Sequence, residues 1–68
     1  MLEKLQEFIE NCYKKAEKYA KTYRDIEQWR GQAYGALEFA IDNKLVDEDE
    51  VIKYWNEMWQ KFNDLNYR

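Results

Sequence analysis

The sequence contains no histidine, no serine and no proline, and it has only one cysteine and two glycines. Without histidine and serine, the chain cannot form the Ser-His or Cys-His pairs that activate nucleophiles. The single thiol, Cys12, forms no disulfide within the chain and cannot build a structural zinc site alone. No glycine-rich phosphate loop is present. We therefore expect a protein that is not an enzyme and that carries no cofactor and no metal.

Two further absences concern location. No segment approaches the roughly 20 apolar residues that a membrane span needs. The first residues, MLEKLQEF, lack the basic region and apolar stretch of a secretory signal. With one cysteine, which favours a reducing compartment, the sequence predicts a cytoplasmic protein with no membrane partner. Its net charge of −3 also argues against direct nucleic-acid binding, which needs a basic surface.

What the sequence does contain is a helical apolar period along its whole length, which we take as one domain over residues 1–68. Apolar residues recur at alternating spacings of three and four in three stripes. The stripes comprise Leu2, Leu5, Ile9, Cys12, Ala16 and Tyr19; Ile26, Trp29, Ala33, Leu37 and Ala40; and Val51, Trp55, Met58, Phe62 and Leu65. Ile52 and Trp59 widen the third stripe, as is typical of a helix packed against two others.

The stripes predict an all-α fold, a compact three-helix bundle. Its helices are expected near residues 2–21, 24–43 and 48–66. Lysines before the first break and acids after it suit the two ends of helix dipoles, and Thr22 can act as an N-cap. Because the apolar spacing continues unbroken from Leu2 to Leu37, one long helix over residues 2–43 that pairs with a second copy in a dimeric coiled coil is the alternative.

Four consecutive acids, Asp47 to Glu50, stand directly before the third stripe. Asp47 fits the N-cap of the third helix, and Glu50 fits its partner in a capping box. Asn43 suits the left-handed residue that ends the helix before. Acids in a first turn also stabilise a helix by about 0.3–1 kcal/mol each. The acidic run is thus explained first as a helix start, and as a contact patch second.

Gly31 and Gly35 fall on the face of the second helix that lies opposite its apolar stripe. Each glycine inside a helix costs about 0.8–1 kcal/mol relative to alanine, so the pair needs a reason. One reason is that the glycines let the first or third helix pack closely. The other is a shallow acidic groove that meets a partner. The predicted partner-binding residues are Glu27, Gly31, Tyr34, Gly35, Glu38, Asp42, Asp47, Glu48 and Asp49.

Charge is unevenly distributed along the chain. Residues 38–50 carry six acids against one base, whereas residues 12–30 carry six bases against three acids. An acidic end suits a basic groove, such as the nucleic-acid channel of an enzyme, because complementary charge speeds association. A solvated face adjusted to the helix dipoles is the simpler explanation of both patches.

The segment QAYGALEFAIDNKLVDEDEVIKYWNEMW, residues 32–59, joins a YGAL.FA helix through a short acidic turn to a Trp-rich helix. In this arrangement, and in its high content of Lys, Asn and Tyr, the segment resembles small helical proteins of phages and mobile elements of low-GC Gram-positive bacteria. That class includes anti-CRISPR inhibitors. The resemblance implies a protein that acts without catalysis by occupying a surface of a larger enzyme, and it carries over no individual residue.

Together these features predict a non-catalytic inhibitor or adaptor that binds a larger protein, such as a nucleic-acid-binding enzyme, at a basic surface. One alternative is a structural module that forms a homodimer or a larger homo-oligomer. The other is a small DNA-binding regulator of the helix-turn-helix kind, against which the net charge argues.

Overall fold

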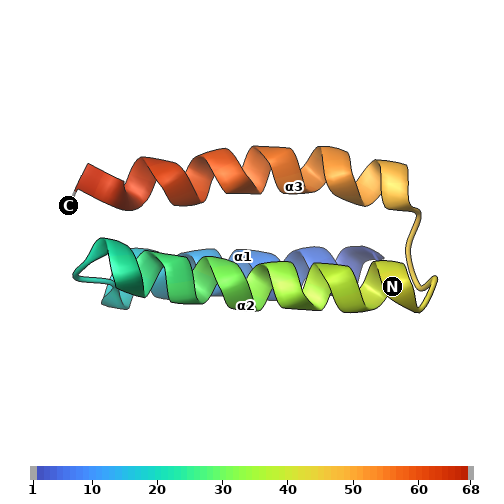
Figure 1. Cartoon of the computed structure of the whole chain (residues 1–68), viewed down its shortest axis with the longest axis horizontal. Helices are drawn as coiled ribbons and strands as arrows, with labels where there is room; N and C mark the ends of the chain where they lie inside the picture. Colours follow the sequence, from blue (N-terminus) through green and yellow to red (C-terminus); the bar gives the residue numbers. More distant parts are fainter. Residues whose placement is uncertain (1, 68) are drawn as a thin grey trace.

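The computed structural model describes residues 2–67 of the chain, and the side chains of residues 2–65. Helix α1 (Leu2–Tyr19) is followed by α2 (Tyr23–Asp42), α3 (Glu48–Asn63) and the short 3-10 helix η1 (Asp64–Tyr67). Figure 1 shows α1 and α2 as an antiparallel pair, with α3 returning along them. The result is a rod of 35 × 16 × 16 Å. The predicted three-helix bundle is confirmed, with α3 ending at Asn63 rather than near residue 66.

The core runs along the axis where the three apolar stripes meet. Spacings of three and four place these side chains on one face of each helix. The buried residues are Leu5, Ile9, Cys12 and Ala16 of α1, Ile26, Ala33, Leu37 and Ala40 of α2, Val51, Trp55, Met58 and Phe62 of α3, and Leu65 of η1. No polar or charged residue is buried among residues 2–65. Apolar packing is therefore the main source of stability in this part of the chain.

A capping arrangement separates α1 from α2. Thr22 is the N-cap of α2, and its Oγ1 accepts a hydrogen bond from Asp25 N at 3.3 Å. In return, Asp25 Oδ2 accepts one from Lys21 N at 3.0 Å. The first bond satisfies a backbone N–H group that a helix start leaves without a partner, and the second holds the residue before the N-cap. The break that the charges and Thr22 predicted is confirmed.

The alternative of one helix over residues 2–43 is wrong. The chain leaves helical geometry after Tyr19 and turns back on itself. Residues of the expected coiled-coil seam, such as Ile9 and Ala33, have no exposed surface because α3 and the neighbouring helix cover them. A second copy cannot pair along a seam that the chain already buries within itself.

The left-handed residue that ends α2 lies one position later than predicted. Lys44 takes the left-handed conformation, with φ 56°, whereas Asn43 has φ −95°. Lys44 N donates a hydrogen bond to Ile41 O at 3.0 Å, and Leu45 N donates to Ala40 O at 2.9 Å. This pair of bonds forms a Schellman motif, in which the residue after the C-cap must be left-handed.

The acidic run begins α3 without the predicted capping box. Asp47 has the extended backbone of an N-cap, and its carbonyl accepts a hydrogen bond from Val51 N at 3.1 Å, but its side chain makes no capping hydrogen bond. Glu48, Asp49 and Glu50 lie exposed in the first turn. Their contribution to the helix start is therefore electrostatic, through the positive end of the helix dipole.

Polar contacts tie α3 to the other two helices at its edges. The Tyr54 hydroxyl donates a hydrogen bond to Gln6 O of α1 at 3.3 Å. Arg30 Nη1 of α2 donates to Asn63 Oδ1 at 2.7 Å. Both bonds lie at the border of the core. One holds Tyr54 of α3 against α1, and the other holds Asn63, the last residue of α3, against α2. Within residues 2–67, no helix has the length and apolar character needed to cross a membrane.

The left-handed Lys44 yields a stability prediction. Lys44→Gly is expected to raise the free energy of unfolding by about 0.5–1 kcal/mol, because glycine adopts a positive φ without steric cost. Urea denaturation measures the change. Asn43→Gly is the matched control and should destabilise the protein, because Asn43 Nδ2 donates a hydrogen bond to Phe39 O at 2.8 Å. A Lys44→Gly protein no more stable than the wild type would contradict this explanation of the turn.

Tyr54 yields a prediction about alkaline pH. Its burial, together with the charges of Glu10 and Glu57, raises the pKa of Tyr54 to about 12 from the usual 10.0 of a tyrosine side chain. Because the folded state holds the phenolic proton more tightly, this stabilisation is present below pH 10 and is lost as the pH rises toward 12. Over this window the free energy of unfolding should fall more steeply for the wild type than for Tyr54→Phe. Urea denaturation at stepped pH tests it, and equal slopes would refute it.

Candidate functional site

Gly31 and Gly35 lie on the exposed face of α2, as the helical period predicts. A Cβ atom built at either position would meet no atom within 4 Å. The glycines therefore do not let α1 or α3 pack closely, and that explanation of the pair is wrong. They leave bare helix backbone on the surface of the bundle.

Two adjoining hollows lie between α2 and α3, and Tyr34 lines both of them. The first, which we call the arginine end, is lined by Glu27, Arg30, Gly31, Tyr34 and Trp59. The second, which we call the acidic end, is lined by Tyr34, Leu37, Glu38, Ile41, Asp42, Glu48, Ile52 and Trp55. Together they form the α2–α3 groove, whose lining comes from these two helices alone.

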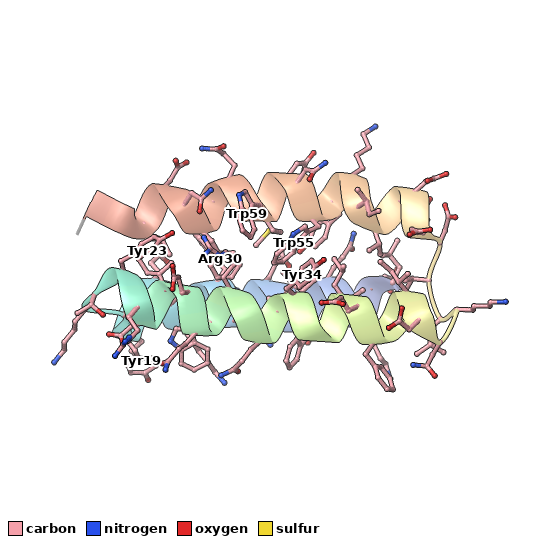
Figure 2. The ribbon with its side chains drawn as sticks, viewed as in Figure 1. Tyr19, Tyr23, Arg30, Tyr34, Trp55 and Trp59 are labelled. Carbon is pink, nitrogen blue, oxygen red and sulfur yellow. The ribbon has the colours of Figure 1, made fainter. Side chains whose placement is uncertain are left out.

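At the arginine end, Arg30 is held between the two helices. Its guanidinium carbon lies 4.1 Å from the centroid of the Trp59 ring and 6.0 Å from that of Tyr23. The hydrogen bond to Asn63 holds the other side of the guanidinium group. Figure 2 shows Arg30 and Trp59 reaching toward each other from α2 and α3. A cation over a tryptophan face contributes about 0.5–2 kcal/mol, and with the bond to Asn63 it holds Arg30 at two points.

Aromatic rings connect the arginine end to the acidic end. The ring centroids of Tyr34 and Trp55 lie 5.5 Å apart, and those of Trp55 and Trp59 lie 6.1 Å apart. In Figure 2 these three side chains follow one another along the space between α2 and α3. Tyr34 and Trp59 are about two-fifths exposed, whereas Trp55 is buried. The groove therefore has a continuous aromatic wall that is partly open to solvent.

The acidic end combines an apolar floor with carboxylates on both sides. Glu38 and Asp42 come from α2, and Glu48 comes from the first turn of α3; all three are exposed. None of the three has an ion pair with another described residue. No lysine or arginine of the described chain lines this end. The lining of this end is therefore net negative.

The groove gathers most, but not all, of the predicted partner-binding residues. Glu27 and Gly31 line the arginine end, Tyr34 lines both ends, and Glu38, Asp42 and Glu48 line the acidic end. Gly35, Asp47 and Asp49 are exposed but line neither hollow. The glycine pair is thus divided, with one member at the groove and the other beside it.

Sequence reasoning missed Arg30 as a site residue and assigned Ile52 and Trp59 to the core. Ile52 is 43% exposed and Trp59 is 42% exposed. These two residues therefore form part of the groove wall and are not buried against another helix. Tyr19, the last residue of the first stripe, is also exposed. A helical period of 3.6 residues indicates the direction in which a side chain leaves its helix, but not whether another helix covers that direction. The period therefore gave no information on the exposure of Ile52, Trp59 and Tyr19.

Three features of the described residues lie outside the groove. Cys12 is buried, and this burial raises the pKa of its thiol, an effect that the charge of Lys15 partly offsets. Such a thiol is unreactive. Among residues 2–67, no three acidic, cysteine or histidine side chains converge as metal ligands. Phe8 and Phe39 are exposed, Phe39 the more so at 63%.

Charge divides the rod into two ends. The acidic stretch of residues 38–50 surrounds the loop between α2 and α3, and the lysines of residues 14–21 lie toward the opposite end. Comparison with protein families, with curated proteins and with solved structures gives no match to this chain. The function of the groove is therefore inferred from its own geometry and charge.

The exposed glycines yield a stability prediction. Gly31→Ala and Gly35→Ala should each raise the free energy of unfolding by about 0.8–1 kcal/mol, because alanine is the better helix former and the added Cβ meets no neighbour. Thermal or urea unfolding measures the change. Ala33→Gly, at a buried position on the same helix, should do the opposite. Loss of stability in either alanine variant would show that the glycines serve the fold after all.

Proposed function

We propose that this protein is a non-catalytic inhibitor or adaptor that occupies a basic surface of a larger protein with its α2–α3 groove. The observation that carries this proposal is the half-exposed apolar wall of Tyr34, Ile52 and Trp59 beside unpaired carboxylates. Apolar side chains that line one groove and remain open to water favour association, since covering them removes apolar surface from water.

The residue types along the groove support a protein partner. Tryptophan, tyrosine and arginine are the residues that most often contribute large binding energies at protein interfaces. Trp59, Tyr34 and Arg30 line the arginine end together. Arg30 is already fixed by Trp59 and Asn63. A rigid aromatic and arginine surface loses little side-chain freedom on binding, which favours affinity.

The glycines give independent support. Together they cost the helix about 1.6–2 kcal/mol relative to alanine, and no described atom packs against either position. A stability cost at a surface position is expected where the position serves contact with another molecule. At Gly31 the absent side chain leaves the edge of the groove open to a closely packed partner.

The acidic end supports a basic partner surface. Glu38, Asp42 and Glu48 present negative charge at one end of the groove. Opposite charge on the partner would raise the association rate and set the orientation of binding. A nucleic-acid-binding enzyme is one class of protein with such a surface, because its channel must attract phosphates.

The alternatives receive less support. The helix-turn-helix motif needs two helices crossing at about 90–120°, whereas α2 and α3 run antiparallel along each other. This argues against a DNA-binding regulator of that kind. Self-association is favoured by one observation, the exposure of Phe8 and Phe39. Those two side chains do not line the α2–α3 groove, so self-association through them is compatible with binding at the groove.

A capture experiment tests the groove. The immobilised chain is mixed with a bacterial lysate, and Gly31→Arg is compared with Gln32→Arg, an exposed position outside the groove. Gly31→Arg should lose at least one protein that the wild type and Gln32→Arg both retain, because the new side chain fills the arginine end and adds positive charge beside Arg30. Circular dichroism confirms that both variants fold. A folded Gly31→Arg protein that keeps every partner would contradict the proposal.

A further inference from the structure

We propose that the occupant of the α2–α3 groove is an amphipathic helix of the partner protein, with its lysine or arginine side chains at the acidic end. This inference rests on the proposed function and specifies its binding chemistry. In this arrangement the apolar face of the partner helix packs against Tyr34 and Trp59. The cationic side chains lie against the carboxylates of Glu38, Asp42 and Glu48.

The shape of the groove fits a helix. Its walls are two antiparallel helices, and a further helix laid between such walls repeats the packing of a helical bundle. From Glu27 to Asp42 the groove follows α2 for four turns, or roughly 20 Å. A helix of about 14 residues has that length. Binding of an amphipathic helix in an apolar groove is a recurrent mode of recognition.

The acidic end fits the side chain of lysine or arginine. Each of these has an apolar stem and a charged tip, and the stem can cover apolar surface while the tip remains in water. Here the apolar surface is that of Leu37, Ile41 and Ile52, and the carboxylates stand on both helices around it. An apolar occupant would leave this charge unpaired, and an acidic one would be repelled.

The arginine end fits the apolar part of the occupant. Glu27 and Arg30 are its two charged residues, and their charges cancel. Arg30 is engaged by Trp59 and Asn63, so its guanidinium group is already held in place. Besides these charges, this end presents the exposed parts of Trp59 and Tyr34. The charge of the groove is therefore polarised, and the occupant should carry its cations at one end.

Titration with two synthetic peptides tests the inference. Both peptides have about 14 residues and the same leucines at helical spacing; one has lysines at its polar positions and the other has glutamates. The probes are the indole N–H signals of the full-length chain in heteronuclear NMR. Trp55 and Trp59 line the groove, whereas Trp29 lies outside it, with Lys15 Nζ 5.7 Å from the centroid of its ring.

The lysine peptide should shift the signals of Trp55 and Trp59 and leave that of Trp29 in place. The glutamate peptide should bind at least roughly tenfold more weakly, because it brings like charge to the acidic end. Equal binding of the two peptides, or no shift of Trp59 with the lysine peptide, would overturn the inference. Light scattering during the titration shows whether a second copy of the chain, rather than the peptide, occupies the groove, and that result would also overturn it.

Paired charge variants provide the matched control. Glu38→Gln with Asp42→Asn removes two carboxylates from the groove, and Glu3→Gln with Glu7→Gln removes two exposed carboxylates from α1. The change in net charge is the same. The first pair should weaken lysine-peptide binding roughly fivefold and the second should leave it unchanged. Equal effects of the two pairs would show that only net charge matters and would overturn the inference.

Failure of this inference can be told apart from failure of the proposed function. If Gly31→Arg loses captured proteins but the lysine peptide does not bind, the groove is a binding site and its occupant is not a basic helix. If Gly31→Arg retains every partner and neither peptide shifts Trp59, the groove is not a binding site, and both proposals are wrong.

Discussion

The packing of Trp55 is the interaction on which both the core and the groove depend. Its ring centroid lies 6.4 Å from that of Phe62 on the core side, and 5.5 Å from that of Tyr34 toward the groove. Aromatic clusters of this kind bury a large area and add directional contacts between rings. A chain with one buried free cysteine and no buried polar group among its described residues depends on such packing to join α3 to α2.

The same packing explains why apolar surface is left over. A domain of 68 residues buries a limited share of its surface, and three helices cannot enclose every large side chain on α3. Trp55 takes the buried position, so Trp59 one turn later remains half exposed, with Arg30 over its ring and Trp55 against it. The groove thus follows from the way in which a small bundle distributes its aromatic residues. Its polarised charge comes from Glu38 and Asp42 of α2 and from Glu48 at the start of α3.

Two local features show that stability alone did not shape this chain. Lys44 occupies a left-handed position that glycine would fill with less strain, whereas Gly31 and Gly35 occupy helical positions that alanine would fill better. Lys44 does not line the groove. The glycines lie on or beside the groove, where we propose that the bare backbone serves contact with a partner.

The sequence by itself determined the three helices, most residues of the core and the break at Thr22, because these depend on helical period, capping and charge within a few residues. Only the tertiary structure decided that Lys44 rather than Asn43 is left-handed, that Trp59 and Ile52 line a groove, and that Arg30 meets Trp59. The physical reason is that helical period specifies the direction of a side chain around its own axis. Which neighbour covers that direction depends on how the helices are rotated and spaced against one another, and packing of the whole core sets that arrangement.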